Sequence, residues 1–362
     1  MEGPRPPHES EWPHLLSFLT SSLRPEHTWS IETEYPTALN TQNRHNVRVM
    51  THNNEIVSHS VLKPMIIKSP HIIYKAAGIG SVVTREDHRN QGFSHKILSD
   101  CLTLAEQQKC DFAILWTHLH DYYRKLGFEL AGTEISSTLH KEFEPPVTGL
   151  RFSDEKNISP DALNRVFAQH TVTTLRTPDE VKQYLKIPQS RAFTAWRQDG
   201  TLAAYAIEGK GADLQNYIHE WGGQVPELLS LLSYIRKSKG EAITIITPQH
   251  SRNLNSQLKA LTPQFEGYLG MIKLVDELGF FAKIKRGFRS EGIQDFVLEK
   301  HGTGYLFGIG RDQLVVPQSS DIVRLLFGPV DYTLFDFQDP KTPETLNKLL
   351  PLPLWIWGWD SV

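Results

Sequence analysis

The residues best suited to chemistry lie between Gly78 and Phe128, where an apolar strand runs into a polar turn and then into a long helix. That helix is predicted to begin at Gly92, just after Arg89. The first turn of a helix leaves backbone N–H groups unpaired and carries the positive end of the macrodipole. A glycine there lets an anion approach the backbone, and Arg89 adds a side-chain cation. The segment therefore predicts a site for a phosphate or pyrophosphate.

On its own the pattern Arg89-Asn90-Gln91-Gly92-Phe93-Ser94 is weak, because glycine makes up about 7% of average sequence and such a match arises by chance. A plain helix N-terminus explains it as well. The context adds weight. The pattern follows the apolar strand Ile79–Thr84 and precedes a buried strand, Phe112–Trp116. The segment Tyr122-Tyr123-Arg124-Lys125-Leu126-Gly127-Phe128 comes next.

Together these two motifs resemble the GNAT acetyltransferase superfamily. That family carries Gln/Arg-x-x-Gly-x-Gly/Ala after the fourth strand and an aromatic-Tyr-x-x-x-Gly-Phe helix after the fifth. Arg89–Ser94 matches the first motif except that Ser94 replaces Gly or Ala, and Tyr122–Phe128 matches the second throughout. Ser94 is small, and its hydroxyl could bond a phosphate. The resemblance implies the GNAT fold, an α/β (α+β) domain with a mixed, mostly antiparallel sheet.

The resemblance also implies where acetyl-CoA is held as the cosubstrate. The fourth strand would offer main-chain groups to the pantetheine arm, the helix start would bind the pyrophosphate, and the end of the fifth strand would line the thioester. For His118 a plain surface histidine stays an alternative, and no metal is expected there. The implied cofactor-binding residues are Val82, Val83, Thr84, Arg89, Asn90, Gln91, Gly92, Phe93, Ser94, His95, His118 and Leu119.

Tyr123 is the predicted general acid. When an amine attacks the thioester, the sulfur of CoA leaves as a thiolate that needs a proton. A tyrosine hydroxyl with a pKa of about 10 can donate to a thiolate whose parent thiol has a pKa of about 8.5. Members of the family carry a tyrosine at this helix position in that role. The alternative, that Tyr123 only packs or hydrogen-bonds to the sulfur, stays open.

The rest of the chain is predicted to be further α/β structure, with a disordered start over residues 1–8 and a linker at Phe143–Thr148. Residues 159–248 repeat the element order of the first domain without an intact phosphate motif, because Glu220 near Gly222 would repel a phosphate. The predicted helices are Ser10–Leu23, Gly92–Gln108, His120–Leu126, Asp161–Gln169, Val225–Lys239 and Ser320–Leu326. The predicted strands are Asn46–Met50, Glu55–Val61, Ile79–Thr84, Phe112–Trp116, Ala192–Arg197, Leu202–Glu208, Asp213–Glu220, Ala242–Thr247, Met271–Val275 and Gly304–Gly308.

The last portion resembles the sterol-carrier-like module that ends the acetyltransferases of the enhanced intracellular survival type. The resemblance rests on Met271–Asp276, Tyr305–Gly308 and Asp321–Gly328. It implies a GNAT acetyltransferase domain over 1–144, a degenerate GNAT-like domain over 145–268 that shapes the acceptor cavity, and a small sterol-carrier-like α/β domain over 269–362.

In that group the main-chain carboxylate at the C-terminus acts as the general base, which maps to Val362. The apolar tail fits this role, since a free terminus is usually polar and frayed and buried tryptophans would anchor it. Those tryptophans are Trp355, Trp357 and Trp359. The alternative, a final core strand whose carboxylate faces solvent, stays open.

Composition narrows the partners and the compartment. The 362 residues carry 38 Lys and Arg against 41 Asp and Glu, a formal net charge of −3, without a basic block. Nucleic acid and membranes are therefore poor partners. The two cysteines, Cys101 and Cys110, are expected to be reduced thiols. Without a signal peptide or a membrane-spanning run, a cytoplasmic protein is expected.

The sequence thus predicts an acetyl-CoA-dependent N-acetyltransferase that needs no metal. It would move the acetyl group to a primary amine, on a small molecule or a peptide, by direct transfer in a ternary complex. A homo-oligomer is compatible with the sequence. Two alternatives stay open: a catalytically silent CoA-binding regulatory or interaction protein, and a tandem acetyltransferase that acts on the precursor of a small thiol cofactor.

Overall fold

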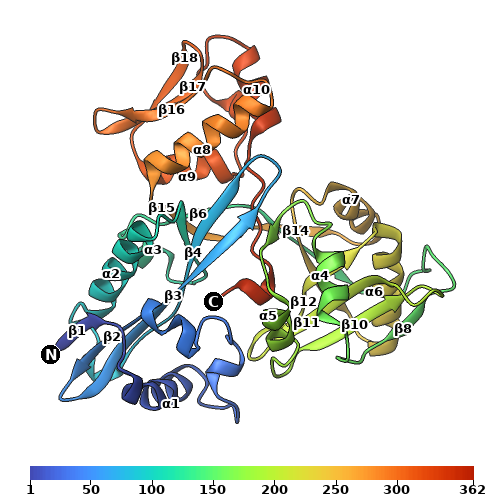
Figure 1. Cartoon of the computed structure of the whole chain (residues 1–362). Helices are drawn as coiled ribbons and strands as arrows, with labels where there is room; N and C mark the ends of the chain where they lie inside the picture. The colour runs from blue at the N-terminus through green and yellow to red at the C-terminus, as the bar shows by residue number, and fades with distance from the viewer.

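The computed structural model describes all 362 residues, and its three β-sheets mark three lobes (Figure 1). The first sheet has eight strands in the order β1-β2-β3-β4-β5-β15-β6, with β9 paired to β3. All neighbours run antiparallel except β4 and β5. The strands are β1 (Glu2–Arg5), β2 (Val47–His52), β3 (Glu55–Lys68), β4 (Ile73–Thr84), β5 (Phe112–Leu115), β6 (Glu129–Ala131), β9 (Thr173–Thr174) and β15 (Gly270–Leu274).

Two helices cover opposite faces of the first sheet. In α2 (Phe93–Gln107), buried Phe93, Ile97, Cys101 and Ala105 stand four residues apart, so one apolar stripe faces the strands. This stripe shares a core cluster with Ile79 of β4. The helix α1 (Trp12–Leu23) packs in a separate cluster, with β2 and β3. The short helix α3 (His120–Arg124) follows β5. The sheet therefore has an α1 side and an α2 side.

The second sheet repeats this plan with seven strands in the order β14-β7-β13-β12-β11-β10-β8. Its one parallel pair, β12 and β13, is joined by a crossover helix, as β4 and β5 are joined by α2. The strands are β7 (Glu134–Leu139), β8 (Arg151–Ser153), β10 (Arg191–Trp196), β11 (Leu202–Lys210), β12 (Asp213–Gly223), β13 (Ile243–Pro248) and β14 (Gln264–Gly267). The helices are α4 (Pro160–Phe167), α5 (Pro178–Tyr184), α6 (Val225–Lys239) and α7 (Arg252–Leu261).

The third lobe is a small antiparallel sheet, β16-β17-β18, with three helices. Its strands are β16 (Phe296–His301), β17 (Gly304–Ile309) and β18 (Asp312–Val316), and its helices are α8 (Glu277–Ser290), α9 (Ser319–Phe327) and α10 (Lys341–Leu349). Six short 3₁₀ turns complete the chain: η1 (Glu9–Glu11), η2 (Ile31–Thr33), η3 (Thr41–Asn46), η4 (Glu86–His88), η5 (Tyr332–Leu334) and η6 (Gly358–Asp360). No helix is both long and apolar enough to cross a membrane.

After α10 the chain leaves the third lobe and runs down between the other two, where it ends (Figure 1). We call residues 350–362 the tail. Its tryptophans Trp355, Trp357 and Trp359 are each at most 2% exposed. The indole N–H of Trp357 donates to the carbonyl of Val172 at 3.0 Å, so this buried ring has its polar partner. The predicted apolar anchoring of the tail is confirmed.

Every predicted helix and strand has a counterpart, and the largest differences in bounds are at β3 and β4. β3 continues past its predicted end, and β4 begins before its predicted start. Alternating buried residues, such as Met65 and Ile67 of β3, continue the strand pattern. The expectation of disorder at residues 1–8 is wrong. Residues 2–5 form β1, which pairs with β2 at the edge of the sheet.

Sheet membership crosses the expected domain limits at three places. β9 pairs with β3 in the first sheet, although it lies within 145–268. β7 lies in the second sheet, although it precedes residue 144, and β15 lies between β5 and β6 of the first sheet, although it follows residue 268. Met271–Val275 thus completes the first sheet. The division into 1–144, 145–268 and 269–362 stays a prediction about folding units.

Candidate active site

The parallel strands β4 and β5 separate partway along their length. They pair at three positions, the last of which joins Gly78 to Ile114. Beyond it, residues 79–84 of β4 have no strand partner on that side, while β5 turns its other edge to β15. We call this opening the splay. Unpaired main-chain N–H and C=O groups along its β4 edge need partners, which an extended ligand arm can supply.

A bulge in β4 lies at the splay. His59 of β3 pairs with Val83 and Val61 pairs with Gly80, so two residues of β4 face one residue of β3. Ser81, one of the two, has a φ of 51°. A bulge bends the strand and changes where its groups point, which is why bulges recur beside active sites. Val82 is the other bulge residue, and Val83 and Thr84 follow it. These three, the predicted cofactor-binding residues of this strand, are half-buried.

The N-terminus of α2 lies just after β4 and has the predicted form. Gly92 is its N-cap with a φ of 78°, and Asn90 has a φ of 62°, so the turn uses two left-handed residues. No side chain caps the helix, and nothing lies within 4 Å of where a β-carbon of Gly92 would be. Asn90, Gln91 and His95 are exposed, whereas the Phe93 side chain is buried in the core. The first amides of the 15-residue helix are open to a ligand.

Arg89 lies at the rim of this turn. Its side chain is 57% exposed and forms an ion pair with Glu86 at 3.2 Å. Exposed pairs of this kind contribute about 0–1 kcal/mol, so Glu86 can be displaced by a phosphate at little cost. Sequence reasoning placed Arg89 correctly at the helix start but missed Glu86 as its competitor.

Ser94 and Tyr122 connect the two motifs. The Tyr122 hydroxyl donates to the Ser94 hydroxyl oxygen at 2.9 Å. The residue that departs from the family pattern therefore ties the start of α2 to α3. The Ser94 hydroxyl keeps its own hydrogen, which it can still donate to a phosphate.

Tyr123 lies on the α2 side of the splay. It is 6% exposed, and its ring packs edge-on against Tyr122 at 5.1 Å and Phe128 at 5.9 Å between centroids. Burial, with a smaller effect of Tyr122, raises the pKa of Tyr123 to about 12. The phenol is therefore protonated at every pH where a protein of this kind works. The other two predicted residues here, His118 and Leu119, are exposed in the loop between β5 and α3.

The tail ends on the α1 side of the same strand. A β-carbon added at Gly80 would lie 2.5 Å from the carboxyl carbon of Val362, and one at Gly78 would lie 2.9 Å from its Cγ2. The main-chain carboxyl group of Val362 therefore lies directly on β4 at the start of the splay. Only glycines leave room for it. Tyr123 and Val362 thus approach the opening from opposite sides of the sheet.

Residues 4–131 match the family model described as an acetyltransferase (GNAT) domain. Most of the first lobe is therefore similar to a GNAT acetyltransferase domain. Three solved structures are similar over almost the whole chain. For a GCN5-related N-acetyltransferase from Anabaena variabilis, the TM-score is 0.66 at 14% identity, with 99% of each chain covered. A conserved protein of unknown function from Enterococcus faecalis, described as a probable N-acyltransferase, gives a TM-score of 0.65 at 14% identity over 96% of each chain. Eis1 from Mycobacterium abscessus gives 0.63 at 11% over 99% of each.

These three likenesses establish the fold, a mixed α/β architecture with the GNAT fold, and the expected fold class is confirmed. A search of curated proteins finds no match. The similarity of the third lobe to a sterol-carrier module stays a prediction.

The second lobe has closed its own splay. β12 and β13 pair only at Tyr217–Thr244 and Ile218–Ile245. Just beyond, the indole N–H of Trp221 on β12 donates to the carbonyl of Ile246 on β13 at 3.0 Å. The Trp357 ring of the tail packs against Trp221 at 5.2 Å between centroids. Pro226 in the first turn of α6 also removes one of the amides that a phosphate would use.

Glu220, which we expected to repel a phosphate, has a structural partner instead. Arg176 binds it through two hydrogen bonds of 2.8 and 3.0 Å and binds Asp360 of the tail at 2.6 Å. All three side chains are at most 2% exposed. Burial alone would raise the pKa of Asp360, but Arg176 and Lys63 outweigh it and keep that pKa lowered. A buried ion triad of this kind costs about 3–5 kcal/mol when one partner is removed.

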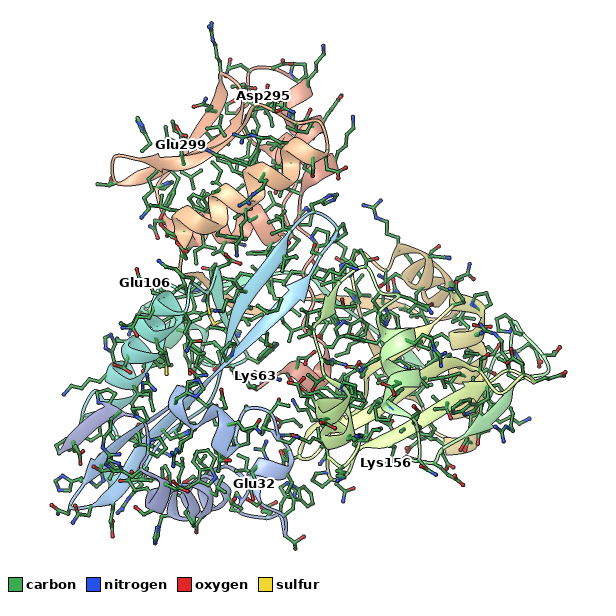
Figure 2. The ribbon with its side chains drawn as sticks, in the orientation of Figure 1. Glu32, Lys63, Glu106, Lys156, Asp295 and Glu299 are labelled. Atoms are coloured by element: carbon green, nitrogen blue, oxygen red, sulfur yellow. The ribbon has the colours of Figure 1, made fainter.

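Lys63, on β3 of the first lobe (labelled in Figure 2), reaches the same triad. Its ammonium donates to the Tyr184 hydroxyl at 3.0 Å and lies 3.9 Å from Asp360. Tyr184, on α5, stacks against Trp359 at 5.5 Å between centroids. The end of the tail is therefore held by both lobes. Sequence reasoning missed this cluster, because its members come from five separate segments and no local motif marks them.

His59 is a second feature that the sequence did not reveal. It is fully buried on β3, and its Nδ1 lies 2.8 Å from the carbonyl of Ser81. A carbonyl can only accept, so Nδ1 carries the hydrogen and Nε2 carries a lone pair. Nε2 has no partner in the protein. Burial lowers the pKa of His59 to about 4. His59 and Val61 are two residues apart on β3, so their side chains lie on the same face of the sheet. This is the α1 side, where Val362 also lies.

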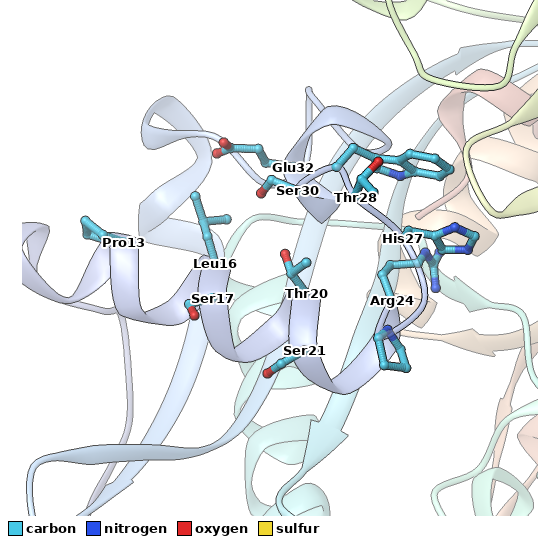
Figure 3. A pocket seen from close by; sticks show the side chains of 12 residues that line it. Pro13, Leu16, Ser17, Thr20, Ser21, Arg24, His27, Thr28, Ser30 and Glu32 are labelled. Atoms are coloured by element: carbon cyan, nitrogen blue, oxygen red, sulfur yellow. The ribbon is translucent and has the colours of Figure 1, made fainter.

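A separate groove of about 490 Å³ lies between α1 and the segment 25–32 (Figure 3). Leu16, Thr20 and Arg24 line it, whereas Leu15 and Leu19 turn toward the sheet. The groove therefore opens on a different side of α1 from the splay. At its end, Arg24 and Trp29 both donate to the buried carboxylate of Glu34.

The close fit at Gly80 gives a first prediction. Gly80→Ala should displace the Val362 carboxyl group, because a β-carbon would stand 2.5 Å from it. We expect kcat to fall about 100-fold with the acetyl-CoA dissociation constant nearly unchanged, since misplacing one group by about 1 Å can cost that factor. Steady-state kinetics and calorimetry check this. A rate in Gly80→Ala equal to that of the original protein would contradict the fit.

Proposed function

We propose that the protein is an acetyl-CoA-dependent N-acetyltransferase that acetylates a primary amine by direct transfer in a ternary complex. One observation carries the proposal. The GNAT domain keeps an open splay with an uncapped helix start beside it, a buried protonated tyrosine on one side and a main-chain carboxyl group on the other. These are the groups that amine acetylation needs.

In this proposal acetyl-CoA lies along the splay. Its pantetheine arm bonds the main chain of Val82, Val83 and Thr84, and its pyrophosphate lies against the amides from Asn90 to His95, with Arg89 and Gln91 at the rim. Gly92 and Phe93 leave the helix start accessible because Gly92 has no side chain and the Phe93 side chain turns into the core. Ser94 is free to donate to a phosphate, and the loop at His118 and Leu119 borders the thioester.

The amine reaches the thioester from the α1 side. Its nitrogen attacks the carbonyl carbon, the C–N bond forms and the C–S bond breaks. The Val362 carboxylate takes the proton from nitrogen, and Tyr123 acts as the general acid for the sulfur. An α-carboxyl has a pKa of about 3.5 in peptides, so the carboxylate acts on the ammonium-like transition state, where the amine proton is acidic.

The raised pKa of Tyr123 refines its role as the acid. A phenol with a pKa of about 12 is a weaker acid than a thiol at about 8.5, so complete transfer to the thiolate is uphill. We propose that Tyr123 first stabilises the developing thiolate through a hydrogen bond and gives up its proton as the thiolate leaves. A charge-assisted O–H bond of this kind is roughly twice as strong as a neutral one.

His59 is the competing proton acceptor. Its Nε2 lone pair is buried and unpartnered, and it lies on the side from which the amine would approach. Its low pKa of about 4 is close to that of a carboxylate. We favour Val362 because its carboxyl group lies on the splay itself. A chain trimmed of Val362 distinguishes between these two candidate bases.

The decisive experiment pairs calorimetry with a thiol-release screen. We expect heat on titration with both CoA and acetyl-CoA, and release of CoA thiol with at least one member of a panel of aminoglycosides, polyamines, lysine peptides and amino sugars. Binding without thiol release across the panel would favour the catalytically silent alternative, and a single defined small acceptor would favour the thiol-precursor alternative. No heat with either ligand would end the proposal.

Cellular context is part of the proposal. Cys101 and Cys110 are buried free thiols, as expected for a reducing, cytoplasmic setting. We also propose no metal requirement, so chelation with EDTA should leave turnover unchanged. The acceptor is proposed to be a small-molecule or peptide amine, and a homo-oligomer remains compatible with the proposal.

A further inference from the structure

Lys210, the last residue of β11 in the second lobe, holds the end of the tail. Its ammonium donates to the carbonyl of Ser361 at 2.5 Å, to the hydroxyl of Ser361 at 3.1 Å and to the carbonyl of Gly358 at 2.9 Å. A lysine ammonium has three N–H donors and no acceptor, so all three donors are used on the tail. The Ser361 carbonyl belongs to the peptide that precedes Val362.

We propose that Lys210 is a positioning residue for acetyl transfer: it fixes the last peptide so that the Val362 carboxylate stays on Gly80. This inference rests on the proposed function and on a chain that ends at Val362. It gives the second lobe, whose own splay is closed by Trp221, a part in the chemistry of the first.

The surrounding contacts show that the second lobe binds three consecutive parts of the end of the tail. Gly358 packs so closely on β12 that a β-carbon there would lie 2.0 Å from Nδ1 of His219. Asp360 is bound by Arg176, and Ser361 is bound by Lys210. Val362 packs on Gly78 and Gly80 of β4 in the first lobe. The Ser361 carbonyl that Lys210 binds belongs to the last peptide before the Val362 carboxylate.

The groups around Lys210 suit an ammonium that is buried but not isolated. Its Nζ lies 4.7 Å from the centroid of the Tyr35 ring, a cation–π contact. Burial and the positive charge of Lys63 lower the pKa of Lys210 to about 7, while Asp213, Asp360 and Glu34 oppose the shift. His219 is another ionisable neighbour on the second lobe. A neutral amine would have two donors for three oxygen acceptors, so the tail favours the charged form.

Lys239 provides a matched control. It is also a buried lysine of the second lobe, with a side chain that is 5% exposed, and it pairs with Glu208 rather than with the tail. Lys239→Met removes a buried ammonium as Lys210→Met does. The two variants differ in whether the lost contacts belonged to the tail.

The test compares Lys210→Met with Lys239→Met in the full chain. For Lys210→Met we expect kcat to fall about 100-fold, the acetyl-CoA dissociation constant to stay within about twofold, and carboxypeptidase to release valine at least about 10-fold faster. Lys239→Met should change none of the three. The split between kcat and acetyl-CoA affinity separates positioning from a general loss of structure.

Each other result overturns the proposal in a recognisable way. Unchanged valine release in Lys210→Met would show that Lys210 does not hold the tail. Faster release with unchanged kcat would show that the tail is held but its carboxylate is not used, which contradicts the base assigned to Val362. If Lys210→Met does not fold, Ser361→Ala replaces it, since it removes one acceptor of the same ammonium and should raise valine release by a smaller factor.

Discussion

A chain that ends at Ser361 is expected to bind acetyl-CoA as well as the full chain and to turn over about 100 to 1000 times more slowly. Losing a general base costs about 10²–10⁴ in rate, and water can supply part of that function. Removing Val362 draws the carboxylate back along the chain by about 3.5 Å, the reach of one extended residue. It leaves Gly80 and the splay.

The new carboxylate would also be neutralised. The Ser361 carbonyl that becomes part of it already lies 2.5 Å from the ammonium of Lys210. An ion pair with Lys210 in that buried place would hold the new carboxylate away from the amine. It would also lower the basicity of this carboxylate. The fold should survive, because Trp355, Trp357 and Trp359 anchor the tail before the cut.

The controls separate the carboxylate from the side chain. Val362→Ala keeps the carboxylate and should keep kcat within about threefold. Two glycines added after Val362 move the carboxylate away without shortening the tail, and should cost about as much as trimming. Full kcat in the trimmed protein would reject Val362 as the base. If His59→Gln in that trimmed protein then lowers kcat, the role of general base would be assigned to His59.

The site was predictable from the sequence wherever its parts are close along the chain. Arg89, Gly92 and Ser94 lie within six residues, and their strand-turn-helix context sets their geometry locally. Tyr123 was found for the same reason, because α3 follows β5 after four residues. Main-chain binding sites of this kind depend on turn type and helix polarity, which short patterns encode.

What escaped prediction depends on pairings between distant segments. Arg176 binds Asp360 from 184 positions away, and Lys63 reaches Tyr184 across 121 positions. Neither partner has a local signal, since a buried charge looks like a surface charge in the sequence. The return of β15 to the first sheet is a similar case, because a five-residue apolar strand fits several sheets equally well. To predict that Val362 lies on Gly80, one would need to know both the distant partners of the buried charges and the strand order of the first sheet.

Tyr123→Phe is expected to lower kcat about 100-fold while leaving the acetyl-CoA dissociation constant within about twofold. The ring would still fill its place against Phe128 and Tyr122, so packing is conserved. Only the hydroxyl that we propose to act on the departing sulfur is lost. Tyr122→Phe is the matched control: it removes a neighbouring hydroxyl, the one bonded to Ser94, and should cost kcat no more than about threefold.

The pH profile sharpens the assignment of Tyr123. Because burial raises its pKa to about 12, the phenol keeps its proton up to that pH, and its ionisation would reduce the rate only above it. Ionisation of Tyr123 should therefore cause no fall in kcat between pH 7 and about pH 10. In this range the pH profiles of the original protein and of Tyr123→Phe should have the same shape. A fall in that range that disappears in Tyr123→Phe would mean that Tyr123 acts as a phenolate base. An equal kcat in the two proteins would remove the hydroxyl from the reaction.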